Sequence, residues 1–182
     1  MLERVVFVAS LFGPVSCSSE ARSWLCRAHL ADGDAAADRL LAAHDRLYPA
    51  RTEPHAERVL PPLTPDRFAE DFIAAHLAQP RTAELLGELL SDGETGPAAA
   101  RQCLIMLAAA ARYPAVRSVL FDLLGARAQL ATHATPPVLR VVIDHASPAL
   151  AAVVEGALPR YSTELLRPAR DLAQHLLDTL PP

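Results

Sequence analysis

Apolar residues recur along this chain at the spacing of amphipathic helices. In LPPLTPDRFAEDFIAAHL, residues 60–77, charged residues alternate with an apolar face that is expected to be buried. That face consists of Phe68, Phe72, Ile73 and Leu77. Thr64 suits the N-cap, Pro65 the first helical position and Asp66 the positive end of the helix dipole. The pattern predicts a helix that begins here and ends at Gln79–Pro80.

The same pattern predicts further helices, with ends marked by proline, glycine or small polar residues. They are expected at residues 2–11, 19–28, from about 34 onward, 82–90, 97–112, 114–128, 136–145, 148–158 and 162–180. A break or kink is expected at Arg167–Pro168, because proline inside a helix removes a hydrogen bond and clashes with the preceding turn. The polar, proline-rich segment at 48–62 is predicted to be a long loop or a β-wing.

Composition supports an all-α or mostly all-α class. The 182 residues include long Ala and Leu runs, only seven Gly and 5% aromatic residues. Ala and Leu lead the helix propensities, whereas strands favour β-branched and aromatic residues. The length suits one substantial core or two smaller ones. We predict two modules, residues 1–79 and residues 80–182, the second built of stacked antiparallel helices of helical-repeat type.

Charge and cysteine content narrow the functional classes. The net charge of −4 disfavours nucleic-acid partners, because phosphate contacts supply most of that affinity. Cys17, Cys26 and Cys103 form no CxxC pair and leave one thiol over from any disulfide. A reducing, cytoplasmic location is therefore predicted.

The first residues, MLERVVFVASLFGPVSCSS, allow two interpretations. One is a buried first helix from Leu2 to Leu11, stopped by Gly13–Pro14. The other is a signal segment with a lipidated Cys17. The second fits less well, because Glu3 cancels Arg4 and Pro14 stands where a lipidation signal needs an aliphatic residue. The apolar run is also too short to span a bilayer, so no membrane association is predicted.

Two segments share features with ligand-binding loops but lack a required residue. The acidic residues of ADGDAAAD, 31–38, are spaced like those of a calcium-binding loop. Ala43, however, occupies the position where such a loop needs a bidentate Glu. GETG, 93–96, has two glycines, but no Lys follows it as in a phosphate-binding loop.

Catalytic and metal-binding patterns are also incomplete. Asp144, His145 and Ser147 are close in sequence, but adjacent helical residues point about 100° apart and no GxSxG motif is present. The three histidines beside apolar faces lack HExxH spacing and are expected to be core or rim residues; they are His76, His133 and His175. We predict a non-enzymatic chain without a cofactor or metal.

Three stretches together carry a family resemblance: residues 60–77, ATPPVLRVVIDHASPALAAVVE at 134–155 and LPRYSTELLRPARDLAQHLLD at 158–178. They resemble the region between the nucleotide-binding core and the tetratricopeptide array of bacterial STAND-class signal-transduction ATPases. The resemblance implies a winged-helix-like module at 1–79, with three helices, a wing at 46–62 and a closing helix, and then helices that lead into the repeats. The ATPase motifs of that family have no counterpart in this chain.

Three functional hypotheses follow. The leading one is a non-enzymatic regulatory or scaffold module that, in its family context, links an ATPase switch to a sensor repeat array. The second is a helical regulator with a small apolar ligand near Trp24, Tyr113 and Phe121. The third is an enzyme on a helical scaffold. The chain is either an excised piece of a larger ATPase or a stand-alone relative.

The last helix contains the predicted interaction site. Leucines recur on one side of it at positions Leu172, Leu176, Leu177 and Leu180. This stripe is wider than one neighbouring helix is expected to cover, and no polar capping helix follows it. We therefore predict that a protein partner or a second copy of the chain docks on these leucines.

Overall fold

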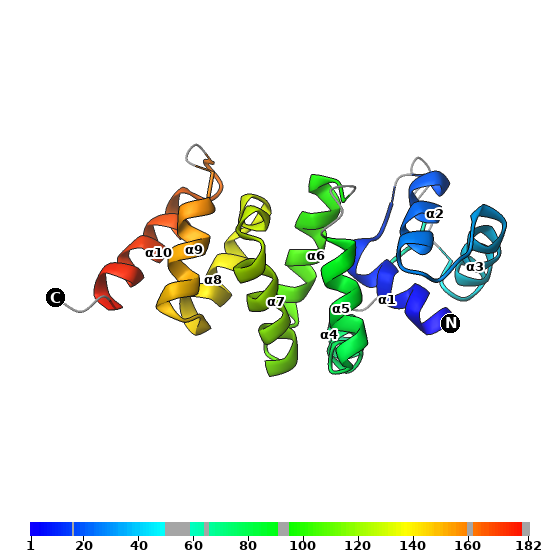
Figure 1. Ribbon diagram of the computed structural model, residues 1–182, viewed down its shortest axis with the longest axis horizontal. Coiled ribbons are helices and arrows are strands. Elements are labelled where there is room, and N and C mark those ends of the chain that lie inside the picture. Colours follow the sequence, from blue (N-terminus) through cyan, green and yellow to red (C-terminus); the bar gives the residue numbers. More distant parts are fainter. Residues whose placement is uncertain (16, 50–58, 64–65, 91–94, 160–161, 180–182) are drawn as a thin grey trace. The chain divides into compact units, whose positions relative to one another are not determined.

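The computed structural model of the chain describes residues 1–15, 17–49, 59–63, 66–90, 95–159 and 162–179. Over these ranges it contains ten α-helices, one 3-10 helix and no strand (Figure 1). A single isolated bridge pairs Val15 with Val59. The predicted all-α class is confirmed. Most of the predicted wing at 46–62 lies outside the described residues, as do Thr64 and Pro65.

The chain divides into two compact units, Met1–Thr95 and Gly96–Pro182. The sequence placed a boundary at 79/80, before the helix that follows Gln79. In the structure that helix, α5 (Pro80–Leu89), packs against α4 (Asp66–Leu77) and belongs to the first unit. The short joint between α4 and α5 makes them neighbours, so they share one core.

In the first unit α1 (Leu2–Phe12) is the central helix. It contacts α4 and two further helices, α2 (Ser18–Arg27) and α3 (Asp34–Leu47). Every residue from Val5 to Phe12 is buried, as expected for a helix that is apolar on nearly all sides. The predicted buried first helix is therefore present.

Trp24 anchors α2 in this core. Its ring stacks on Phe12 with centroids 4.2 Å apart, and the guanidinium carbon of Arg27 lies 4.5 Å from its centroid. The same guanidinium donates to the Leu89 carbonyl at the end of α5, with an N···O distance of 2.6 Å. One arginine thus covers the tryptophan and holds a helix C-terminus, where a positive charge is favoured.

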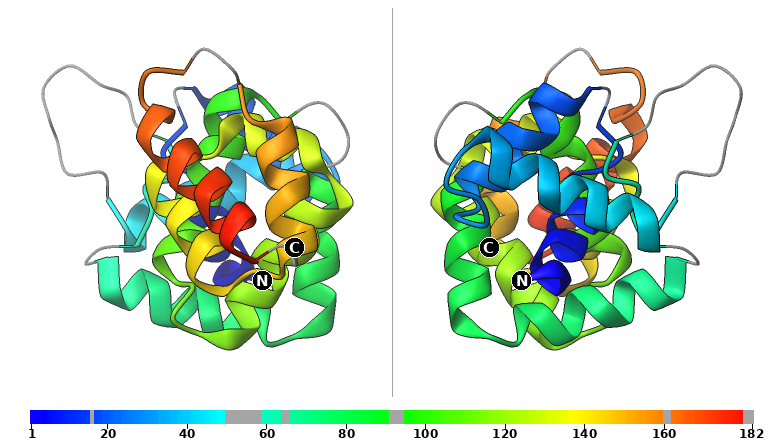
Figure 2. Two further views of the ribbon diagram at one scale, coloured as in Figure 1. Left: turned by 90° about the vertical axis from the view of Figure 1, so that its left-hand side faces the viewer. Right: turned by 90° about the vertical axis from the view of Figure 1, so that its right-hand side faces the viewer.

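The second unit is a stack of six helical elements: α6 (Pro97–Ala109), α7 (Pro114–Ala126), the 3-10 helix η1 (Ala128–His133), α8 (Pro136–His145), α9 (Pro148–Ala157) and α10 (Leu166–Thr179). Helices α6 to α9 each begin with a proline. Proline lacks the backbone N–H, and at the first helical position an N–H would have no intrahelical acceptor. The last helix, α10, packs against both α8 and α9 (Figure 2).

Three predicted local features are wrong. Phe68, expected on the buried face of α4, is 57% exposed, whereas Ile73 and Leu77 are buried. The helix expected to be capped by Thr82 begins at Pro80 instead. The last helix begins at Leu166, so Pro168 lies in its first turn and causes no kink. Amides of a first turn have no intrahelical acceptor, and proline loses nothing there.

Candidate functional site

Helix α10 carries the predicted interaction leucines, which differ in how far their side chains are exposed. Leu172 is fully buried, in a helix that packs against both α8 and α9. Leu176 is half-buried, and Leu177 is 68% exposed. Leu180 lies outside the described residues. Among the three described leucines, Leu177 is therefore the one that offers most of its side chain to a partner.

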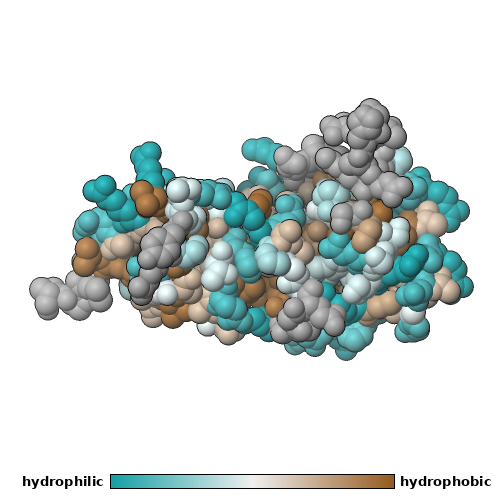
Figure 3. Space-filling model, turned by 90° about the horizontal axis from the view of Figure 1, so that it is seen from above, coloured by the Kyte–Doolittle hydropathy of each residue, from teal (hydrophilic) through white to brown (hydrophobic). Residues whose placement is uncertain are grey.

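A second exposed leucine lies on the same side of α10. Leu166 is 72% exposed and precedes Leu177 by eleven positions. At 100° per residue, positions eleven apart differ by only about 20° around a helix, so the two leucines form one line about 16 Å long. Ala173 lies between them and is half-buried. We call Leu166, Ala173 and Leu177 the leucine edge. Figure 3 shows apolar groups among polar ones on the surface of the second unit.

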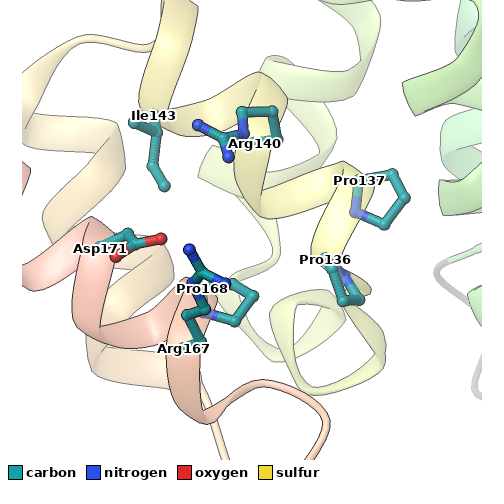
Figure 4. Close-up of a pocket in the computed structure, with 7 residues that line it drawn as sticks. All are labelled: Pro136, Pro137, Arg140, Ile143, Arg167, Pro168 and Asp171. Atoms are coloured by element: carbon teal, nitrogen blue, oxygen red, sulfur yellow. The ribbon is translucent and has the colours of Figure 1, made fainter.

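Another surface feature lies on the α8 side of α10. A groove of about 440 Å³ runs between these helices (Figure 4). We call it the arginine groove; it is lined by Pro136, Pro137, Arg140, Ile143, Arg167, Pro168 and Asp171. In Figure 4 the side chains of Arg140, Ile143 and Arg167 project toward the space between the two helices. Both arginines are exposed, and Ile143 is half-buried.

The two groove arginines differ from the paired arginines of the protein. Arg22 lies 2.7 Å from Asp38, and Arg101 lies 2.6 Å from Glu164. Neither Arg140 nor Arg167 has a hydrogen-bond or ion-pair partner among the described residues. The groove therefore presents two guanidinium groups without a direct partner and one carboxylate, Asp171, beside an apolar floor. Neither arginine stands out in the sequence, because they are 27 positions apart on different helices.

His44 is the main titratable feature of the first unit. It is buried in α3, its ring centroid lies 5.2 Å from that of Tyr48, and it lines a cavity of about 250 Å³. Its Nε2 has no hydrogen-bond partner among the described residues. Burial lowers the pKa of this imidazole, and the neighbouring Asp45 carboxylate opposes that effect.

This burial predicts a pH dependence of stability. Because the pKa of His44 is lower in the folded chain than its ordinary 6.5, the unfolded chain binds the proton more readily. The contribution to stability is complete above about pH 6.5 and is lost as the pH falls below that value. Urea unfolding at pH 7.5 and 5.0 should show a smaller pH effect for His44→Phe than for wild type. Equal pH effects in the two proteins would contradict the prediction.

His76 has a structural environment, as expected for a core or rim histidine. Its ring packs against Phe7 and Phe72, with centroids 5.4 and 4.2 Å away. Nδ1 lies 3.0 Å from the Phe72 carbonyl oxygen, and Nε2 lies 3.2 Å from a Glu3 carboxylate oxygen. Both ring nitrogens thus have acceptors close by, which fixes the ring between α1 and α4.

The described residues contain no cluster of three or more His, Cys, Asp or Glu able to hold a metal ion. Burial strongly raises the pKa of the Cys103 thiol, which keeps it in the unreactive protonated form. Of the residues that the ligand-binding hypothesis groups together, Trp24 belongs to the first unit, and Tyr113 and Phe121 belong to the second. No helix of the described ranges is long and apolar enough to cross a membrane.

Comparison with known proteins supplies no relative: no family model, curated protein or solved structure matches the chain.

Proposed function

We propose that this chain is a non-enzymatic helical scaffold module that pairs with a second copy of itself through the leucine edge of α10. The observation that carries the proposal is the exposure of Leu166 and Leu177 on one line of a helix that is already packed on its other side. Exposed apolar groups that are aligned in this way favour association, because burial removes them from water.

The leucine edge is self-complementary. In an antiparallel pairing of two α10 helices about a two-fold axis, Leu166 of one copy meets Leu177 of the other. Arg170 then meets Ala173, whose small side chain leaves room for the arginine stem. Two buried leucines per copy supply several kcal/mol, from which the cost of association is subtracted. The result is a weak dimer with a Kd of about 0.1–1 mM.

Light scattering across a concentration series tests this pairing. The wild-type mass should rise toward that of a dimer as the concentration approaches about 1 mM. Leu177→Glu should remain monomeric, because it places a carboxylate in the apolar contact. Gln129→Glu adds the same charge at an exposed position of η1 and should behave as wild type. A monomeric wild type, or unchanged association of Leu177→Glu, would show that the leucine edge does not pair.

The resemblance to STAND-class ATPases gives this scaffold a context. In that setting the module would lie between an ATP-driven switch and a ligand-sensing repeat array, and pairing of modules would bring switches together. The genomic reading frame around the coding sequence tests the context separately from the pairing. An upstream nucleotide-binding domain and downstream repeats would support it.

A further inference from the structure

We propose that the arginine groove binds an acidic peptide segment of a partner protein. A Glu or Asp carboxylate of that segment lies between Arg140 and Arg167, and a neighbouring apolar side chain packs on Ile143 and the groove prolines. This inference goes beyond self-pairing, because the groove and the leucine edge lie on different sides of α10. Arg167 and Asp171 lie about 100° and 140° around the helix from Leu166.

A carboxylate matches the chemistry of the groove. Arg101 is an arginine of the same unit that does bind a carboxylate: one of its guanidinium nitrogens lies 2.6 and 2.8 Å from the two Glu164 carboxylate oxygens. Arg140 and Arg167 have no such partner within the described residues. Guanidinium groups bind carboxylates through paired N–H donors, so two of them on facing helices select a carboxylate-bearing ligand.

The form of the groove indicates a peptide segment more than a small molecule. Its lining residues Pro136, Ile143 and Pro168 are half-buried, and the rest of the lining is exposed. Such a surface cannot enclose a small ligand, whereas pockets that hold one bury most of its area. A peptide can span the groove and use both the apolar floor and the arginines.

Charge favours an acidic partner without favouring nucleic acid. The second unit has eight Arg against six Asp and Glu, a net charge of +2, whereas the first unit has nine against fifteen, a net charge of −6. In the groove, Asp171 offsets one of the two arginines. One net positive charge suits a single carboxylate, but it is too little for a phosphate backbone, which needs several cationic contacts.

A phage-displayed random dodecapeptide library, selected on the full wild-type chain, provides the probe. The enriched peptides should contain Asp or Glu next to Leu, Ile, Val or Phe. An enriched pool that is not acidic, or a selection that yields no binder, would overturn the proposal.

Binding of the selected peptides, labelled with fluorescein, is then measured by fluorescence anisotropy. Arg140→Gln and Arg167→Gln should each weaken binding about two- to five-fold, and the double variant by at least about four-fold. Arg81→Gln removes the same charge from an exposed position of α5, outside the groove and the leucine edge, and should bind as wild type. Replacing the acidic residues of the peptide by Gln or Asn should weaken binding to the wild type.

Two results would refute this assignment. The first is equal peptide affinity in wild type and in the double variant with unchanged circular dichroism. The second is salt-sensitive binding of a labelled DNA duplex that depends on Arg140 and Arg167, which would assign the groove to nucleic acid instead.

Discussion

Leu172→Ala is expected to lower the free energy of unfolding by about 2–5 kcal/mol, the range for leucines replaced by alanine in packed cores. Leu172 is fully buried, and α10 packs against α8 and α9 together. The missing methyl groups would leave a cavity that two flanking helices cannot both close. Guanidinium unfolding followed by far-UV circular dichroism measures the loss, because all helices contribute to that signal.

Leu177→Ala is the matched control for this prediction. Leu177 lies on the same helix five positions later but is 68% exposed, so its replacement should change stability by no more than about 0.5 kcal/mol. The pair of variants distinguishes the structure from the sequence pattern, which placed both leucines on one interaction stripe. Equal effects of the two substitutions would contradict the burial described here.

Gly13→Ala should destabilise the first unit by about 1–3 kcal/mol, the usual cost of overpacking. A Cβ on Gly13 would lie 2.2 Å from the Leu60 carbonyl oxygen and 2.6 Å from the Ala9 carbonyl oxygen. Both obstacles are backbone atoms, so no side-chain rotation relieves the clash. The φ angle of −82° is open to any residue, and the close approach alone accounts for glycine here.

Trp24 provides the readout for Gly13→Ala. It is the only tryptophan in the chain and stacks on Phe12, next to Gly13, so its fluorescence reports on this part of the first unit. Gly156→Ala is the control, because a Cβ there meets no atom within 4 Å. Alanine near the end of α9 should be neutral or stabilising by up to about 1 kcal/mol. A Gly13→Ala protein as stable as wild type would disprove the close approach of Leu60.

The candidate surfaces could be predicted only in part. The leucine pattern marks α10 as the interaction helix and includes Leu177, whose exposure the structure describes. The pattern omits Leu166, because the helix was expected to begin at Ser162 and to break or kink at Arg167–Pro168. With the helix start moved to Leu166, the eleven-residue spacing to Leu177 becomes visible in the sequence itself.

The positions and ends of most helices follow from the sequence alone. Pro97, Pro114, Pro136 and Pro148 begin helices as predicted, because a proline at the first helical position depends only on its own backbone and that of the next turn. The all-α class follows from the same local preferences, summed over Ala- and Leu-rich segments.

The tertiary structure decided which face of each helix is covered. The periodic pattern places Phe68 and Leu172 on the apolar sides of their helices. The number and placement of neighbouring helices leave Phe68 exposed and bury Leu172. The arginine groove likewise exists because α8 and α10 pack together, which brings Arg140 beside Arg167. Helix formation depends on residues within a turn or two, whereas burial and grooves depend on contacts between segments far apart in the chain.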